Sequence, residues 1–317
     1  MDHQGLVEPL RQVDVPPERL DLGRPPLLTG PEVVEAGLPH GPDLVVGPGE
    51  RLDLGHRRVE VGHPRRLVGV QRHAGDQGLV RRCGLHRPPR PLQIGCDLER
   101  AEWAVEAAAT YDAIVAGVAL HPNEAPRVDD LDAAMATIER LATSHDKVRA
   151  IGETGLDSFR TGEDGRARQV ESFRRHIDLA KRLDKTLVIH DRDAHDDVLR
   201  VVDEEGAPDR WVMHCFSGDA AFARACLDRG AHLSFAGTVT FKNAEPQRDA
   251  LRIAPLDRVL VETDAPYLTP MPHRGRSNAS YLVPLTVRAM AEVRGEDLGT
   301  LCAALDGNTE TAFGGPW

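Results

Sequence analysis

From residue 92 onward, short apolar runs alternate with longer amphipathic segments, and this alternation most constrains the fold that the chain can adopt. In the longer segments apolar residues recur at the 3.6-residue spacing of a helix, whereas the short runs are typical of buried strands. A regular strand–helix alternation produces a parallel sheet covered by helices. The expected strands are residues 92–95, 113–120, 148–152, 186–190, 211–214, 231–235 and 258–262, and the expected helices include 98–109, 131–142, 169–183, 194–204 and 220–229.

The number of these units predicts the architecture. Seven to eight strand–helix units over about 225 residues fit an α/β fold of the TIM type, a (β/α)8 barrel, better than an open doubly wound sheet. No GxGxxG motif follows a strand and no P-loop motif occurs, so no nucleotide cofactor is expected.

Hydropathy and charge limit where the protein works and what it binds. No apolar run approaches the roughly 18 residues that a membrane span needs, and the N-terminus shows no secretory signal. We therefore expect a cytoplasmic monomer without a membrane partner. The net charge of −11 disfavours a broad basic surface for nucleic acid, although a bound cation would still offer phosphates a local positive field.

Residues 1–91 differ in composition from the rest of the chain. They contain no Lys, Ile, Phe, Tyr, Trp, Ser or Asn, but thirteen Pro and six His. Such a segment lacks the side chains of an ordinary core, and its prolines interrupt most stretches in which a helix could form. Two interpretations remain open: a disordered proline-rich arm, or translation outside the natural reading frame of a GC-rich gene. We therefore divide the chain into this atypical segment and a barrel domain, residues 92–317.

Polar residues that can bind metal follow five of the seven expected strands. The active site of a (β/α)8 barrel lies at the carboxyl ends of its strands, so these residues should meet at one end of the barrel. Neutral imidazoles and carboxylates are ligands of Zn²⁺, Mn²⁺ and Mg²⁺. A single His at a strand end is usually an ordinary hydrogen-bonding group, but five coincident cases favour a metal centre. The residues are His121, Glu153 with Asp157, His190, His214, and Glu262 with Asp264.

Two residues at these strand ends have alternative explanations. Asp264 could cap a helix, but the Ala-Pro-Tyr-Leu-Thr-Pro that follows does not begin a helix cleanly. Cys215, next to His214, could be a thiol nucleophile, but no third group that orients such a pair can be identified. A small, packed cysteine is the more frequent case. We therefore leave Cys215 out of the expected chemistry.

Six sequence motifs resemble those of the TatD family of metal-dependent hydrolases. They occur in the family's order, and the resemblance runs from about Gln93 to Phe313. It implies a TIM barrel of the amidohydrolase kind with one or two divalent ions, Zn²⁺, Mg²⁺ or Mn²⁺. It also implies deoxyribonuclease or 3′-to-5′ exonuclease activity on DNA and, in some members, RNA. The motifs are GETGLD (152–157), IHDRDAHDD (189–197), HCFSGD (214–219), SFAGTVTFKNA (234–244), LVETDAPYLTP (260–270) and PHRGRSNAS (272–280).

The resemblance also implies roles for particular residues. Carried over by motif, the metal ligands would be Glu153, His190, His214 and Asp264, of which Glu153 would bridge two ions and Asp264 would also be the general base. Both carboxylates would therefore be catalytic. His121 and Asp157 would have supporting positions near the metal or the substrate. The candidates for phosphate contacts are Lys242, Arg274 and Asn278, for which ordinary surface roles are equally open.

One family motif is missing. The first strand of the family ends in His-x-His-Leu-Asp, which supplies two imidazole ligands, and no His-x-His occurs in this chain. The seven expected strands thus correspond to strands two to eight, and the first strand and its helix are missing or replaced. We hypothesise a frameshift or misassigned start upstream of codon 92; sequencing the locus and finding an intact frame would reject this. With the His pair absent, we expect weak metal binding and poor activity.

Three functions remain open from the sequence. The first is a metal-dependent nuclease with DNA as its substrate. The second is a metal hydrolase of carboxylic esters or amides, because the same metal–water chemistry serves acyl transfer and the fold does not choose the substrate. The third is a non-catalytic barrel or the product of a pseudogene. A shortage of basic residues around the rim would favour the second over the first.

Overall fold

The computed structural model describes residues 51–53, 58–60 and 91–315. The chain forms two compact units, residues 1–65 and 66–317. In the first unit, strands β1 (Arg51–Asp53) and β2 (Arg58–Glu60) pair antiparallel. All the other described elements belong to the second unit. The hypothesis on the reading frame concerns residues 1–91, and apart from residues 51–53, 58–60 and 91 these lie outside the described residues.

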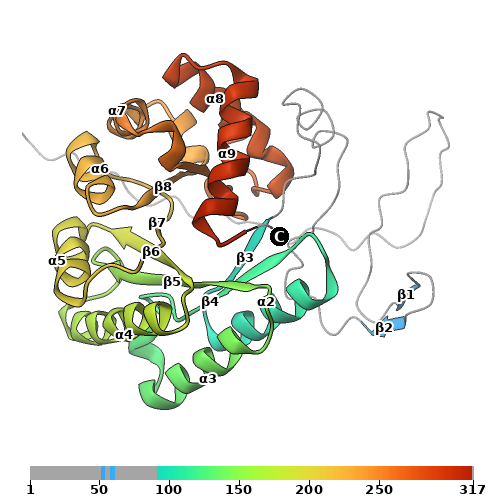
Figure 1. The fold of residues 1–317 in the computed structure, drawn as a ribbon, viewed down its shortest axis with the longest axis vertical. Helices are drawn as coiled ribbons and strands as arrows, with labels where there is room; N and C mark the ends of the chain where they lie inside the picture. The colour runs from blue at the N-terminus through green and yellow to red at the C-terminus, as the bar shows by residue number, and fades with distance from the viewer. Residues whose placement is uncertain (1–50, 54–57, 61–90, 316–317) are drawn as a thin grey trace, which may run out of the picture. The chain divides into compact units, whose positions relative to one another are not determined.

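A curled sheet of parallel strands forms the centre of the second unit (Figure 1). Neighbouring strands follow one another in sequence, from β3 at one edge to β9 at the other. This order and the curl confirm the expected TIM-type barrel of α/β class. Between β3 and β9, where the first strand of a (β/α)8 barrel would lie, residues 91–315 supply no strand. The strands are β3 (Leu92–Gly95), β4 (Val115–Val118), β5 (Val148–Asp157), β6 (Thr186–Arg192), β7 (Trp211–Met213), β8 (His232–Phe235) and β9 (Val259–Val261).

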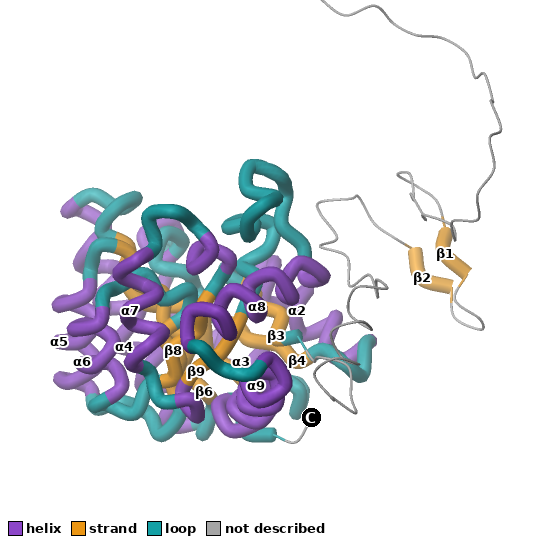
Figure 2. The backbone as a smooth tube through the Cα atoms, turned by 90° about the horizontal axis from the view of Figure 1, so that it is seen from above, coloured by secondary structure: helices purple, strands orange, loops and turns teal. Residues whose placement is uncertain are grey.

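Helices lie outside this sheet (Figure 2). Several begin at an aspartate whose carboxylate accepts hydrogen bonds from the first turn, as at Asp97, Asp130, Asp219 and Asp297. None of the described helices is both long enough and apolar enough to cross a lipid bilayer. The helices are α2 (Leu98–Thr110), α3 (Leu131–Thr143), α4 (Glu163–Arg182), α5 (His195–Glu205), α6 (Ala220–Leu227), α7 (Glu245–Ile253), α8 (Val283–Arg294) and α9 (Leu298–Ala312).

Two boundaries differ by more than two residues from those expected from the sequence. Strand β5 continues to Asp157 because Thr154–Asp157 pair with Ile189–Arg192 of β6, after a register shift between Gly152 and Thr154. Helix α4 begins at Glu163, six residues before the expected start at residue 169, because its first residues are charged and do not show the apolar periodicity. Both differences place the loop between β5 and α4 at residues 158–162, close to the end of β6.

The amino-terminal end of the sheet is closed by apolar side chains. Val188, Val212 and Leu260, from three strands, pack with Phe313, which follows α9. The chain is fixed there because Arg149 Nη1 donates a hydrogen bond of 2.8 Å to the carbonyl of Gly314. The polar strand ends predicted from the sequence lie at the opposite, carboxyl end, which is the catalytic end of this fold.

Candidate metal centre

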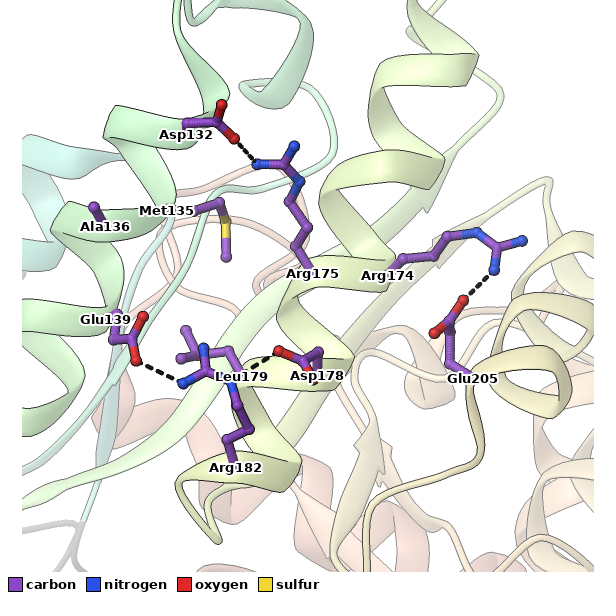
Figure 3. Close-up of a pocket in the computed structure, with 10 residues that line it drawn as sticks. All are labelled: Asp132, Met135, Ala136, Glu139, Arg174, Arg175, Asp178, Leu179, Arg182 and Glu205. Atoms are coloured by element: carbon purple, nitrogen blue, oxygen red, sulfur yellow. Dashed lines mark hydrogen bonds and ion pairs between the residues drawn. The ribbon is translucent and has the colours of Figure 1, made fainter.

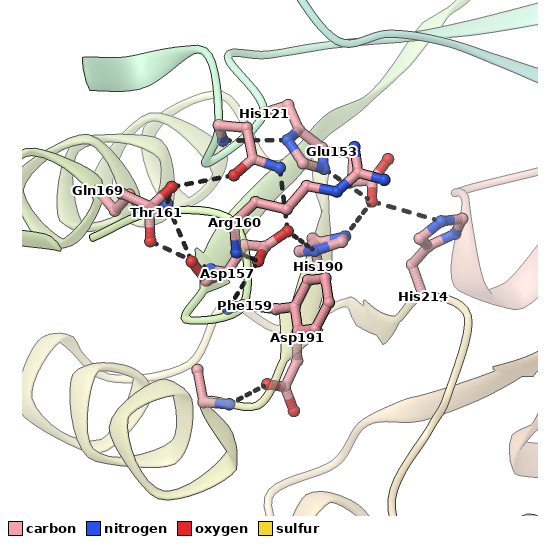
Figure 4. Close-up of polar contacts among 12 residues, drawn as sticks. His121, Glu153, Asp157, Phe159, Arg160, Thr161, Gln169, His190, Asp191 and His214 are labelled. Atoms are coloured by element: carbon pink, nitrogen blue, oxygen red, sulfur yellow. Dashed lines mark hydrogen bonds and ion pairs between the residues drawn. The ribbon is translucent and has the colours of Figure 1, made fainter. Parts of the chain in front are cut away.

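Glu153 is the centre of a cluster of imidazoles at the carboxyl end of the sheet (Figure 4). Its side chain is almost fully buried. Glu153 Oε1 lies 2.6 Å from Nδ1 of His190, 3.4 Å from Nε2 of His214 and 3.7 Å from Nε2 of His121. The four residues come from or just follow different strands, so only the closing of the sheet brings them together.

Asp264 completes the predicted ligand set. Its Oδ1 lies 3.8 Å from His214 Nε2, so Glu153 and Asp264 face the same imidazole nitrogen. Its backbone φ of 53° falls in the left-handed region, which non-glycine residues seldom adopt and which is found often at functional sites. Burial raises the pKa of the Asp264 carboxyl to about 7. The structure therefore gathers Glu153, His190, His214 and Asp264 in one place.

The electrostatics of the cluster favour positive charge. Burial lowers the pKa of His190, but the nearby carboxylates of Asp157 and Glu153 outweigh it and raise that pKa to about 9. Burial likewise raises the pKa of Glu153, yet the charge of His214 and the hydrogen bond with His190 bring it below its usual value. The field that stabilises an imidazolium here would also stabilise a divalent cation.

The donor set also fits a divalent cation. Ligand atoms of His121, Glu153 and His190 all lie within 4.8 Å of one another. One of these imidazoles is oriented against ligation, however. His121 Nδ1 accepts a hydrogen bond of 3.1 Å from the backbone N–H of Asn123, and a neutral imidazole carries only one hydrogen. That hydrogen is then on Nε2, facing Glu153, and burial, which lowers the pKa of His121 to about 4, keeps the ring neutral. We therefore interpret His121 as a hydrogen-bond donor to the site.

Glu262 orients His214, whereas the sequence analysis named it only among the polar residues at the strand ends. Glu262 Oε2 lies 2.9 Å from His214 Nδ1, and the Ser234 hydroxyl donates a hydrogen bond to the same oxygen. A carboxylate on one imidazole nitrogen fixes the ring and leaves the other nitrogen free to bind a metal. Glu262 directly follows strand β9, two residues before Asp264, and this position at a strand end was the signal available in the sequence.

Asp157 supports His190 from the other side of the cluster. Its Oδ2 lies 3.4 Å from His190 Nε2, which is within ion-pair distance. The two atoms do not form a hydrogen bond, and His190 Nε2 has no other hydrogen-bond partner among the described residues. Asn123 Nδ2 donates a hydrogen bond of 2.9 Å to the same oxygen, and Thr161 Oγ1 donates one of 3.0 Å to Asn123 Oδ1. This chain of contacts holds the loop after β5 against the loop after β4.

Two cysteines lie close to the site. Cys96 Sγ donates to Glu153 Oε2 at 3.7 Å, a contact that the sequence analysis did not anticipate. Burial, followed by the charge of nearby carboxylates, raises the pKa of Cys96 and of Cys215 well above the usual thiol value. Both are therefore neutral thiols at pH 7, and neither has the low pKa of a cysteine nucleophile.

The three candidates for phosphate contacts lie in the loops after β8 and β9. Asn278 is buried, and its amide donates hydrogen bonds to the carbonyls of Thr263 (2.6 Å) and Tyr267 (2.7 Å). We infer that it braces the loop that carries Asp264. The guanidinium of Arg274 stacks on Phe241, 4.3 Å from the ring centroid, and Lys242 is exposed.

A hollow of about 560 Å³ lies elsewhere, on the outer face between α3, α4 and α5 (Figure 3). Its arginines are paired with carboxylates: Arg174 with Glu204 and Glu205, Arg175 with Asp132 and Glu171, and Arg182 with Glu139 and Asp178. Paired guanidinium groups on helix surfaces leave little positive charge for an anionic ligand. The chemistry of the side chains, not the size of the cavity, therefore identifies the site.

Comparisons with known proteins agree with this assignment. A family model described as TatD related DNase matches residues 72–314, a match that begins before Gln93, where the motif resemblance begins. The uncharacterized metal-dependent hydrolase TatD of Mycobacterium tuberculosis is 45% identical over 245 residues, which cover 76% of this chain and 92% of that protein. The uncharacterized metal-dependent hydrolase YabD of Bacillus subtilis is 38% identical over 217 residues, which cover 68% of this chain and 84% of that protein.

Solved structures show the same fold. The TatD homolog YjjV of Escherichia coli superposes with a TM-score of 0.68 at 27% identity, covering 76% of this chain and 92% of that chain. A TatD-family hydrolase of Entamoeba histolytica superposes with a TM-score of 0.65 at 18% identity, covering 76% and 90%. From its sequence match and its fold, the chain belongs to the TatD family of metal-dependent hydrolases.

Proposed function

We propose that this hydrolase is a nuclease that cleaves phosphodiester bonds at the ends of DNA, with Glu153, His190, His214 and Asp264 as the ligands of a divalent metal. The observation that carries the proposal is the convergence of His190 and His214 on one buried oxygen of Glu153. The family description as a DNase supports a nucleic acid substrate.

Each protein group has a defined task in this proposal. A divalent ion, when bound, supplies Lewis acidity to the phosphoryl oxygen and lowers the pKa of a bound water towards about 7. Asp264, at the edge of the cluster beside His214, accepts the proton of the attacking water. Glu262 holds the ring of His214 so that Nε2 faces the site.

His121 acts on the substrate in this proposal. Its Nε2 hydrogen faces Glu153 in the structure, at a donor–acceptor separation of 3.7 Å, which is too long for a strong hydrogen bond. A phosphoryl oxygen next to Glu153 would be a better acceptor. A neutral donor in a buried site stabilises the charge that develops on such an oxygen during displacement.

The missing His-x-His motif sets the expected strength of the activity. Four predicted ligands are present, but the two imidazoles of the family's first strand have no counterpart in the sequence. Each lost ligand weakens metal binding, so the chain with its present sequence should need high metal concentrations and cleave its substrate slowly. A variant whose N-terminus carries a grafted His-x-His strand should bind metal more tightly.

The test is hydrolysis of a labelled single-stranded oligonucleotide in Mg²⁺, Mn²⁺ or Zn²⁺, with a chelator as the blank. It uses the full chain and the His-x-His graft, each with Glu153→Gln and Asp264→Asn, and Glu106→Gln on the exposed surface of α2 as the matched control. The proposal predicts metal-dependent cleavage that both site variants lose and the control keeps. Metal binding without cleavage by either chain would refute the nuclease assignment, and hydrolysis of ester or amide substrates would then be measured.

A further inference from the structure

The loop after β5 carries an aromatic side chain that does not pack into the core. Phe159 is 63% exposed, whereas Phe173, Phe216 and Phe235 are at most 1% exposed. A single exposed apolar side chain is common on protein surfaces, so the surroundings of this ring decide whether it has a role. Figure 4 shows Phe159 with Asp157 and Arg160, its neighbours in this loop.

A cation covers one face of the ring. The guanidinium carbon of Arg192, the last residue of β6, lies 3.8 Å from the centroid of Phe159. The exposed part of the ring is therefore its other face and edge. A flat apolar surface backed by a guanidinium is suited to a planar aromatic ligand that carries negative charge.

This surface is held rigidly next to the metal centre. One carboxylate oxygen of Asp157 accepts hydrogen bonds from the backbone of Phe159 (3.0 Å) and Arg160 (2.8 Å). Its other oxygen lies 3.4 Å from His190 Nε2. The backbone N–H of Ser158 donates a 2.9 Å hydrogen bond to the carbonyl of Arg192. The same carboxylate thus lies close to a predicted metal ligand and holds the loop that presents the ring.

Two arginines near the Phe159 ring are free to bind an anion. Within residues 91–315, the guanidinium groups of Arg160 and Arg192 form no ion pair with a carboxylate, in contrast to Arg174, Arg175 and Arg182 on the outer helices. Arg160 is exposed, and Figure 4 draws it reaching toward the side of the cluster where Glu153 and His121 lie. Carboxylate-free arginines in a chain of net charge −11 mark a place for an anion.

We propose that Phe159, Arg160 and Arg192 form the subsite for the nucleotide next to the cleaved phosphate, with its base stacked on the open face of Phe159 and its phosphates held by the two arginines. This rests on the proposed nuclease function. A base reaches Phe159 only when it is unstacked from its neighbours, so the subsite selects single-stranded ends over paired ones.

The experiment measures binding as well as cleavage. The probe is a short single-stranded DNA with 2-aminopurine, a base whose fluorescence falls on stacking, at its 3′ end, and a second probe has an abasic residue there. The full chain is compared with Phe159→Ala, Phe159→Tyr, and Arg160→Gln and Arg192→Gln. Tyr111→Ala is the matched control, because Tyr111 is also an exposed aromatic but follows α2, just before β4 begins at the amino end of the sheet.

The expected results are quantitative. Phe159→Ala loses the fluorescence quench and weakens binding of the intact probe about tenfold, whereas Phe159→Tyr and Tyr111→Ala bind like the parent. The abasic probe binds the parent about tenfold more weakly and is insensitive to Phe159→Ala. Each arginine variant lowers the slope of log K against log salt by about 0.7, the value for one phosphate contact on a single strand. Thermal unfolding of Phe159→Ala should match the parent, since the ring is exposed.

The failure of this inference differs from the failure of the proposed function. Cleavage that needs Glu153, together with equal binding of the intact and abasic probes, would overturn the stacking subsite and leave the nuclease assignment standing. Base-dependent binding at Phe159 without any metal-dependent cleavage would support stacking of a base on this ring and overturn the nuclease assignment. Absence of binding by either probe would reject the subsite and direct attention to a protein partner for this surface.

Discussion

The two ends of the same sheet have opposite chemistry. At the amino end, Val188, Val212 and Leu260 pack with Phe313 in an apolar cluster. At the carboxyl end of these strands, titratable groups surround Glu153, and their mutual interactions shift several pKa values. The strands thus separate a region that stabilises the fold from a region that serves chemistry. A substitution at either end should change one property and leave the other almost unchanged.

Removing the ring of Phe313 tests the stabilising end and should have the largest effect on stability. Phe313→Ala leaves a cavity beneath the strands and should lower the free energy of unfolding by about 3–5 kcal/mol. Urea titration measures this loss of stability. Calorimetric titration with Mn²⁺ at low temperature, where the variant is folded, should show the same metal affinity as the parent chain. A drop in metal affinity equal to that of a ligand variant would show that the two ends are not independent.

A buried histidine with uncharged partners sharpens the comparison. His176 of α4 is fully buried; its Nε2 accepts a 3.2 Å hydrogen bond from Leu120 N–H, and its Nδ1 donates one of 2.7 Å to the carbonyl of Ser172. Burial lowers the pKa of His176 to about 4, with the Ser172 bond opposing the shift. The pKa of His190, which has carboxylate partners, is instead raised.

The pKa of His176 predicts acid sensitivity. Between pH 6.5 and about 4 the unfolded chain binds a proton at this position that the folded chain does not, so stability is complete above pH 6.5 and falls as the pH falls. This one residue should remove about 2 kcal/mol by pH 5. Urea titrations at pH 7.5 and pH 5 should therefore show a smaller loss for His176→Gln than for the parent or for His273→Gln. An equal loss in all three chains would contradict the prediction.

Glu262→Gln tests the support of the metal centre. The amide keeps the size of the side chain but removes the charge that orients His214 Nδ1, so Mn²⁺ affinity should fall about 10- to 100-fold. Stability in urea should change little. The matched substitution Glu106→Gln on α2 should leave metal affinity unchanged, and a Glu262 variant with parent affinity would remove this carboxylate from the centre.

The smallest expected effect is that of His121→Gln on metal affinity, and it distinguishes a hydrogen-bond donor from a metal ligand. If the hydrogen of His121 is on Nε2, then His121→Gln, which still offers an N–H donor, should keep metal affinity within about twofold, a change of about 0.4 kcal/mol. Under the same conditions His190→Gln should lose affinity strongly. Comparable losses in the two variants would show that His121 binds the metal, as its distances alone suggest.

The sequence predicted the strand positions well, and it located the candidate ligands at the strand ends, for a local reason. Apolar periodicity and the polar residue that ends each strand are properties of neighbouring residues, and parallel strands necessarily bring their carboxyl ends together. The extension of β5 to Asp157 was missed because it depends on pairing with β6, after a register shift that composition does not reveal. The assignment of the site residues to metal remains a proposal that the variants above test.

The sequence by itself determined the alternation that makes a parallel α/β barrel, the family motifs and the set of His, Glu and Asp residues at the strand ends. Only the tertiary structure decided which of them face one another. The Glu262–His214 pair and the stacking of Arg192 on Phe159 each join residues whose contact depends on backbone direction and strand register. Local sequence patterns encode secondary structure and burial, whereas the orientation of a side chain at a site is set by partners distant in the chain.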